Sequence, residues 1–137
     1  MKPQDLANIA QTAFNARDEA GLRAMWTDDF HFVGPDAESH GIDAMVEREH
    51  GLWRAFPDVT ASIEIVSAGP DTLAMQTTMT GTHTGPLDLG GRTLPATGRA
   101  INLSMAVHLW FRDGLACRER VFYDRMTLLQ QLGVVGG

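Results

Sequence analysis

Apolar residues recur at helical spacing in three segments of the first half of the chain and again near its end. The first segment begins at Pro3, which suits a first helical turn, and the second follows Asp18, a side chain suited to cap a helix. A third amphipathic segment covers 41–55 and ends before Pro57, which cannot continue a helix. We therefore predict three helices in the first half and a short helix over 126–132.

The second half of the chain changes to a period of two, which is typical of strands. Four alternating segments are separated by glycine, proline or aspartate: 60–69, 71–85, 99–114 and 115–124. The last two are joined by a hairpin turn in which Gly114 can take a positive φ. A shorter strand is expected over 30–34, with loops over 35–41 and 86–98.

Helices followed by long strands predict an α+β fold in which the helices pack on one face of a curved antiparallel sheet. One face of the two longest strands is apolar, apart from one histidine: Leu73, Met75, Met79, His83, Ile101, Leu103, Met105, Val107, Leu109 and Phe111. The opposite face is rich in threonine and ends in His108 and Trp110. This polar and aromatic face favours self-association as a homodimer.

The length and composition limit the classes of partner. A chain of 137 residues is expected to form a single domain over 1–137. A net charge of -6 excludes the basic surface of a typical nucleic-acid-binding protein. No apolar run is long enough to span a bilayer, and the N-terminus has no apolar signal core. We expect a cytoplasmic protein without nucleic-acid or membrane partners.

Cysteine and histidine spacing gives no sign of a metal site. Cys117 is the only cysteine, so neither a disulfide framework nor a thiolate zinc site is expected. His31, His40 and His50 show neither HxH nor HxxxH spacing. The sequence therefore predicts no bound metal.

The stretch RERVFYDR concentrates charge where the last strand is expected to end. Asp124 in this stretch has two interpretations: an N-cap of the final helix, or a general acid or base at the edge of a pocket. Strict alternation places Asp124 in phase with Arg118 and Arg120, and opposite to Glu119 and Val121. A bulge or a bend is needed to bring Asp124 inside if the arginines face outward.

Five short motifs occur in an order that resembles a known family: HGIDAM, WRAFPD, GTHTG, FRDGL and FYDRMTLLQQLG. The resemblance is to the SnoaL-like polyketide cyclases of the nuclear transport factor 2-like superfamily, and it covers nearly the whole chain. It implies a cone-shaped curved antiparallel sheet with N-terminal helices packed on its concave face. The superfamily hosts cyclases, isomerases, hydrolases and non-catalytic binding proteins, so the resemblance alone does not fix the activity.

The resemblance implies that Asp124 is the general acid/base of an intramolecular aldol closure that needs no metal or organic cofactor. His83 lies on the apolar strand face, where it can assist the proton transfer or can be a core histidine satisfied by the backbone. The substrate implied is a hydrophobic, carbonyl-rich small molecule.

Further side chains are candidates for binding that substrate. Asp58 is either an acid at the pocket rim or a turn former, as the sequence FPD allows both. Tyr123 and Arg120 can donate hydrogen bonds to an enolate, or can serve as a core hydroxyl and a surface charge. The apolar candidates for the pocket wall are Phe14, Trp26, Trp53, Phe56 and Met105.

Three functions are consistent with these residues. The first is a cyclase of lyase or isomerase type. The second is an epoxide hydrolase in which Arg118 or Arg120 with Asp58 and Asp124 activates water. The third is a non-catalytic dimer that binds an apolar molecule. Because Tyr123 is the only tyrosine, a ketosteroid-isomerase type of oxyanion hole is disfavoured.

Overall fold

The computed structural model describes residues 2–135. The first half of the chain forms α1 (Pro3–Asn15), α2 (Glu19–Arg23), β1 (Trp26–Val33), β2 (Glu38–His40) and α3 (Ile42–Ala55). The second half forms β3 (Thr60–Ala68), β4 (Thr72–Thr82), β5 (Leu87–Leu89), β6 (Arg92–Leu94), β7 (Ala100–Arg112), β8 (Leu115–Phe122) and α4 (Arg125–Gln131).

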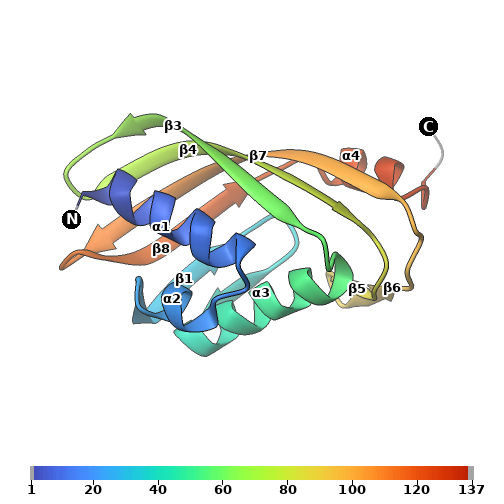
Figure 1. Ribbon diagram of the computed structural model, residues 1–137, viewed down its shortest axis with the longest axis horizontal. Helices are drawn as coiled ribbons and strands as arrows, with labels where there is room; N and C mark the ends of the chain where they lie inside the picture. Colours follow the sequence, from blue (N-terminus) through green and yellow to red (C-terminus); the bar gives the residue numbers. More distant parts are fainter. Residues whose placement is uncertain (1, 136–137) are drawn as a thin grey trace.

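Six strands form one curved sheet in the order β2-β1-β8-β7-β4-β3. Neighbouring strands are antiparallel except β1 and β8, which run parallel. Helices α1 and α3 lie over one face of this sheet, and the small β5–β6 hairpin lies at one end of α3 (Figure 1). The predicted α+β fold, with N-terminal helices packed on the concave face, is confirmed.

The alternation of the long strands explains how the sheet can have one buried and one exposed face. On β7 the side chains of Ile101, Leu103, Val107, Leu109 and Phe111 are buried, and the residues between them are mostly exposed. On β4 the buried positions Leu73, Thr77 and Met79 follow the same phase. The helices therefore cover the apolar face, as the sequence predicts.

Two predicted turns and caps are present. The side chain of Asp18 accepts a hydrogen bond from the backbone N–H of Gly21 and caps α2. Asp113 and Gly114 both have positive φ, at 53° and 80°, in the hairpin between β7 and β8. Both features confirm local predictions that rest on backbone chemistry.

One strand starts earlier than predicted, and three short strands were not predicted. Strand β1 begins at Trp26 and not at the expected residue 30. The early start was not predicted because the polar pair Asp28-Asp29 interrupts the alternation of the strand, near a register shift against β8. The expected loops 35–41 and 86–98 contain the three-residue strands β2, β5 and β6. Such short strands carry too few residues to show a period of two.

No helix of the described residues is long and apolar enough to cross a membrane.

Candidate functional site

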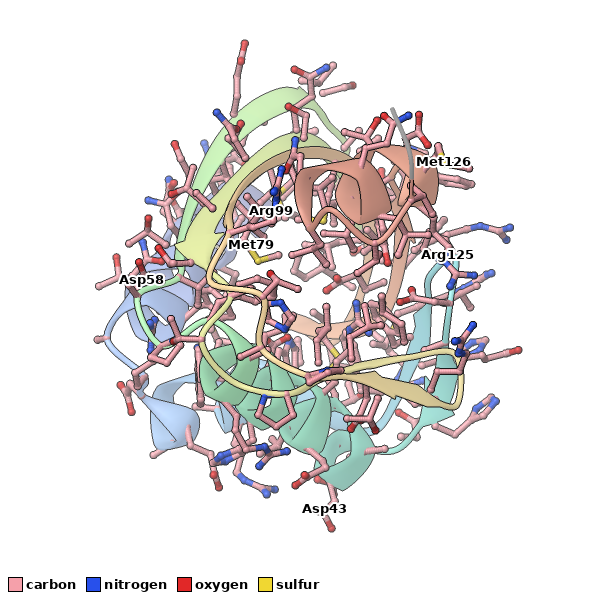
Figure 2. The ribbon with its side chains drawn as sticks, turned by 90° about the vertical axis from the view of Figure 1, so that its right-hand side faces the viewer. Asp43, Asp58, Met79, Arg99, Arg125 and Met126 are labelled. Atoms are coloured by element: carbon pink, nitrogen blue, oxygen red, sulfur yellow. The ribbon has the colours of Figure 1, made fainter. Side chains whose placement is uncertain are left out.

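A largely apolar cavity lies between the concave face of the sheet and the helices. Its volume is about 150 Å³, which is similar to that of a cavity that binds benzene. Phe14, Trp26 and Met105 line it, as three of the five apolar candidates from the sequence. Met79 is also part of the wall, and its side chain points into the space that the sheet surrounds (Figure 2).

Two carboxyl groups face this cavity, one from the helix layer and one from the sheet. Glu49 extends from α3 and Glu119 from β8. Glu49 is only 8% exposed. Glu119 is half-buried because its side chain contributes to the cavity wall. Buried carboxylates without a partner are uncommon in proteins, so the pair needs a chemical explanation.

Burial raises the pKa of both carboxyl groups toward neutrality. The pKa of Glu49 rises to about 8, first because the group is buried and second because Glu119 places a negative charge nearby. Burial raises the pKa of Glu119 to about 7. The two groups interact, so their protonation steps belong to the pair. Near pH 7 the pair retains a proton, and one carboxyl can act as an acid while the other acts as a base.

Arg48 supplies the positive charge in the cavity wall. It lowers the pKa of both glutamates, although burial outweighs this effect. Its guanidinium lies over the Phe32 ring, 4.0 Å from the centroid, and Phe32 is the β1 partner of Glu119 in the sheet register. The salt bridges among the described residues leave Arg48 without a carboxylate partner. Its donors are therefore available to a bound molecule.

A second, more polar hollow adjoins the first between α3 and the β5–β6 hairpin. It has a volume of about 360 Å³, and its wall includes Leu87 and Asp88 from the hairpin. Arg48 and Leu52 belong to the walls of both hollows. A molecule larger than one ring can therefore extend from the apolar cavity past Arg48 into a polar environment.

The structure places Asp124 outside the cavity. Its side chain is exposed and caps α4, accepting hydrogen bonds from the backbone N–H groups of Met126 at 2.9 Å and Thr127 at 3.4 Å. The bend that could have turned Asp124 inward does not occur before the helix begins. The N-cap interpretation therefore describes its geometry, and it does not contact Glu49 or the cavity wall.

His83 is a core histidine and not part of the cavity wall. Its side chain is fully buried, with the ring packed 5.4 Å from that of Phe56 between centroids. Its Nδ1 lies 2.9 Å from Thr97 Oγ1 and accepts a hydrogen bond from the Thr97 backbone N–H. Burial lowers the pKa of His83, which keeps the imidazole neutral. These contacts connect the end of β4 to the segment before β7.

The polar binding candidates from the sequence do not line the cavity either. Asp58 is exposed and accepts hydrogen bonds from the backbone N–H and hydroxyl of Thr82, which lower its pKa. In Figure 2 it lies at the periphery of the cone. Arg120 is exposed, with its guanidinium 5.1 Å from the centroid of the Phe122 ring. Neither residue is close enough to the cavity to assist the glutamates directly.

The other aromatic candidates lie outside the cavity wall. Trp53 packs against Phe14, with 5.7 Å between ring centroids, and Phe56 is buried against the His83 ring. Burial raises the pKa of Tyr123, and the nearby negative charge of Asp36 raises it further. None of these three candidates forms part of the wall of either hollow described above.

Sequence reasoning missed Glu49 and Glu119, but the chain carries a signal for each. Glu49 lies four residues after Met45, which is buried on the same face of α3. Glu119 lies two residues before the buried Val121, so alternation places it on the interior face of β8. The signal is a glutamate at a position where the helical or strand period predicts a buried apolar residue.

Asp124 gives a direct test of its capping role. Asp124→Ala is expected to lower the free energy of unfolding by about 1 kcal/mol, because alanine cannot accept the two N–H bonds. Asp124→Asn can still accept them and should change stability little. Urea denaturation followed by tryptophan fluorescence measures both variants. Loss of catalysis in Asp124→Asn with unchanged stability would contradict this interpretation.

A curved sheet covered by helices is the nuclear transport factor 2-like fold, and here it encloses an apolar cavity with ionisable groups. Within this fold class, the SnoaL-like polyketide cyclase family matches residues 4–132, and the chain belongs to that family. The resemblance inferred from the five motifs is confirmed.

Solved structures of similar proteins agree with this assignment. IdmH from Streptomyces antibioticus, provisionally assigned as a polyketide cyclase, is 29% identical with a TM-score of 0.77 and covers 97% of this chain and 99% of its own. AclR from Streptomyces galilaeus, provisionally assigned as a hydroxylase, is 26% identical with a TM-score of 0.80, and the match covers 98% of this chain and 82% of AclR. TsrD from Streptomyces laurentii is 25% identical with a TM-score of 0.83, and the match covers 96% of this chain and 95% of TsrD. No curated protein is significantly similar in sequence.

Proposed function

We propose that this protein catalyses an aldol-type ring closure of a hydrophobic, carbonyl-rich small molecule, with Glu119 and Glu49 as the proton-transfer groups. The observation that carries the proposal is a pair of carboxyl groups with raised pKa values in an apolar cavity. Membership of the SnoaL-like polyketide cyclase family supports the same reaction class.

The proposed reaction is balanced in protons. Ionised Glu119 removes a proton from a carbon next to a carbonyl, and the resulting enolate forms a carbon–carbon bond with a second carbonyl of the same molecule. Protonated Glu49 donates its proton to the oxygen of that second carbonyl, which becomes a hydroxyl. Arg48 stabilises the negative charge on the enolate oxygen. A proton shift from Glu119 to Glu49 restores the starting state.

The dimensions of the two hollows restrict the substrate. A cavity of about 150 Å³ accepts one ring of the folded chain. The remainder of a longer molecule would extend past Arg48 into the polar hollow of about 360 Å³. We therefore propose an extended substrate with an apolar end and a more polar, oxygen-rich end.

The reaction can be tested with linear poly-β-ketone thioesters in buffer that contains EDTA. Wild-type protein is expected to accelerate formation of the cyclic product, measured by absorbance and mass spectrometry, and Glu119→Gln should not. Competition with Nile red for the cavity reports binding separately. Binding without any acceleration of ring closure would favour the non-catalytic binding protein.

An epoxide hydrolase remains a second candidate, because Arg48 acts electrostatically on both Glu49 and Glu119. In that reaction Glu119 would remove a proton from water and Glu49 would protonate the opening epoxide oxygen. The set expected from the sequence, Asp58 and Asp124 with an arginine, is not assembled at the cavity. Incorporation of ¹⁸O from labelled water into the product would distinguish hydrolysis from ring closure.

We also propose that the protein is a homodimer through the outer face of the sheet. The N-terminal helices pack on the other face (Figure 1), and Phe122 is 47% exposed on the outer one. Phe122→Glu is expected to shift the protein from dimer to monomer, because a charge replaces apolar contact area at the interface. Sedimentation velocity measures the change. Wild-type protein that is monomeric at every concentration would contradict the proposal.

A further inference from the structure

Two histidines and a glutamate lie close together on the β1–β2 hairpin, away from the cavity. His31 and His40 are direct partners in the antiparallel register of β1 and β2, and Glu38 is two residues before His40. Side chains two residues apart on a strand share a face, so all three project from the same side of the hairpin. His31 alternates with the buried Phe30 and Phe32, which places this group on the outer face of the sheet.

The three ligand atoms are already close together. His31 Nε2 lies 2.8 Å from Glu38 Oε1, and His40 Nε2 lies 3.7 Å from the same oxygen. One ligand atom from each residue can be chosen so that all three lie within 4.8 Å of one another. The two imidazole rings stack with 4.3 Å between centroids and 10° between planes. Small side-chain rotations would bring the three atoms to about 2.0–2.2 Å from one ion.

We propose that His31, Glu38 and His40 bind a divalent transition-metal ion such as zinc. Two imidazole nitrogens and one carboxylate oxygen are a donor set that suits Zn²⁺ and leaves a position open for water. The ion takes the place of the proton that His31 and Glu38 share in their hydrogen bond. The spacing rule did not find this site, because its ligands come from two paired strands and not from one helix or strand.

The site connects the edge strand of the sheet to its neighbour. Strand β2 has only three residues and pairs on one side with β1. A bound ion joins the two strands through their side chains and stabilises the folded state in proportion to its occupancy. Arg118, the β8 partner of His31, places a positive charge near Glu38 and weakens binding of a cation. The site is independent of the proposed catalysis, since it lies on the opposite face from Glu119.

The proposal is tested by titrating EDTA-treated, dialysed full-length protein with ZnCl₂. Isothermal titration calorimetry is expected to show saturable one-to-one binding in the micromolar range, and His40→Ala should weaken it by at least about tenfold. Imidazole NMR signals of His31 and His40 should shift, and zinc should raise the melting temperature of wild type but not that of His40→Ala. Glu38→Gln provides a second variant at an exposed position and should also weaken binding.

His50→Gln is the matched control. His50 Nε2 lies 2.6 Å from Glu19 Oε1, so this pair offers a histidine and a carboxylate but, among the described residues, no third ligand. The variant should bind zinc as wild type does. Unchanged zinc affinity in both His40→Ala and Glu38→Gln would overturn the proposal, as would zinc-dependent shifts confined to His50 or His108.

Discussion

Glu119→Gln is expected to lower the rate of proton abstraction from carbon by roughly 10²–10⁴-fold, the usual contribution of a positioned general base. Glutamine matches the size of glutamate but cannot accept the proton. The effect can be measured without the natural substrate, as protein-dependent exchange of the α-hydrogens of 1-indanone in D₂O by NMR. This ketone is close to the size of the apolar cavity, and binding should be unchanged because the cavity wall is otherwise intact.

The pH dependence of the exchange rate identifies both carboxyl groups. In wild type, kcat/KM should rise as the Glu49–Glu119 pair loses its first proton near pH 7 and fall as the pair loses its second proton near pH 8, because the reaction needs one ionised and one protonated carboxyl group. Asp124→Asn is the control, since Asp124 is exposed at the start of α4. Full exchange activity in Glu119→Gln would exclude Glu119 as the base.

Hydrophobic periodicity was sufficient to predict the fold because the long elements each have one buried face. The thirteen residues of β7 and the fourteen of α3 repeat their period several times, so neighbouring polar residues do not obscure it. The parallel contact of β1 with β8 was not predictable in the same way. It pairs residues about ninety positions apart in the sequence, such as Trp26 with Ala116, and no local pattern records a contact over that separation.

The candidate site was predicted less well, because position and chemistry point to different residues. Alternation placed Glu119 and Asp124 on opposite faces, and in the structure Glu119 lines the cavity whereas Asp124 is exposed. The family motif drew attention to Asp124, because the nearby Arg118 and Arg120 could act together with its carboxylate. A carboxylate in the interior phase is therefore a stronger indication of a cavity acid than a charged cluster at a strand end.

Glu49→Gln is expected to stabilise the protein increasingly as the pH rises. Folding raises the pKa of Glu49 from 4.5 to about 8, so the folded state binds more protons than the unfolded state between these values. The contribution of neutral Glu49 is fully present below pH 4.5 and is lost as the pH rises through 8. At about 1.4 kcal/mol per pH unit, the titration of Glu49 alone costs wild type on the order of 5 kcal/mol over this range, and the variant avoids this loss.

Urea denaturation at intervals between pH 5 and pH 8.5 measures the free energy of unfolding of both proteins. Burying the glutamine amide changes the free energy of unfolding by the same amount at every pH. Removing the ionisation of Glu49 changes it by an amount that grows with pH. The slope of the free energy of unfolding against pH therefore separates the two effects. Glu47→Gln is the matched control, because Glu47 lies on the same helix with a side chain that is 73% exposed. Parallel curves for wild type and Glu49→Gln would mean that Glu49 ionises in the folded protein as it does in the unfolded chain. In that case the cavity would lack its acid, and a binding function would be favoured over ring closure.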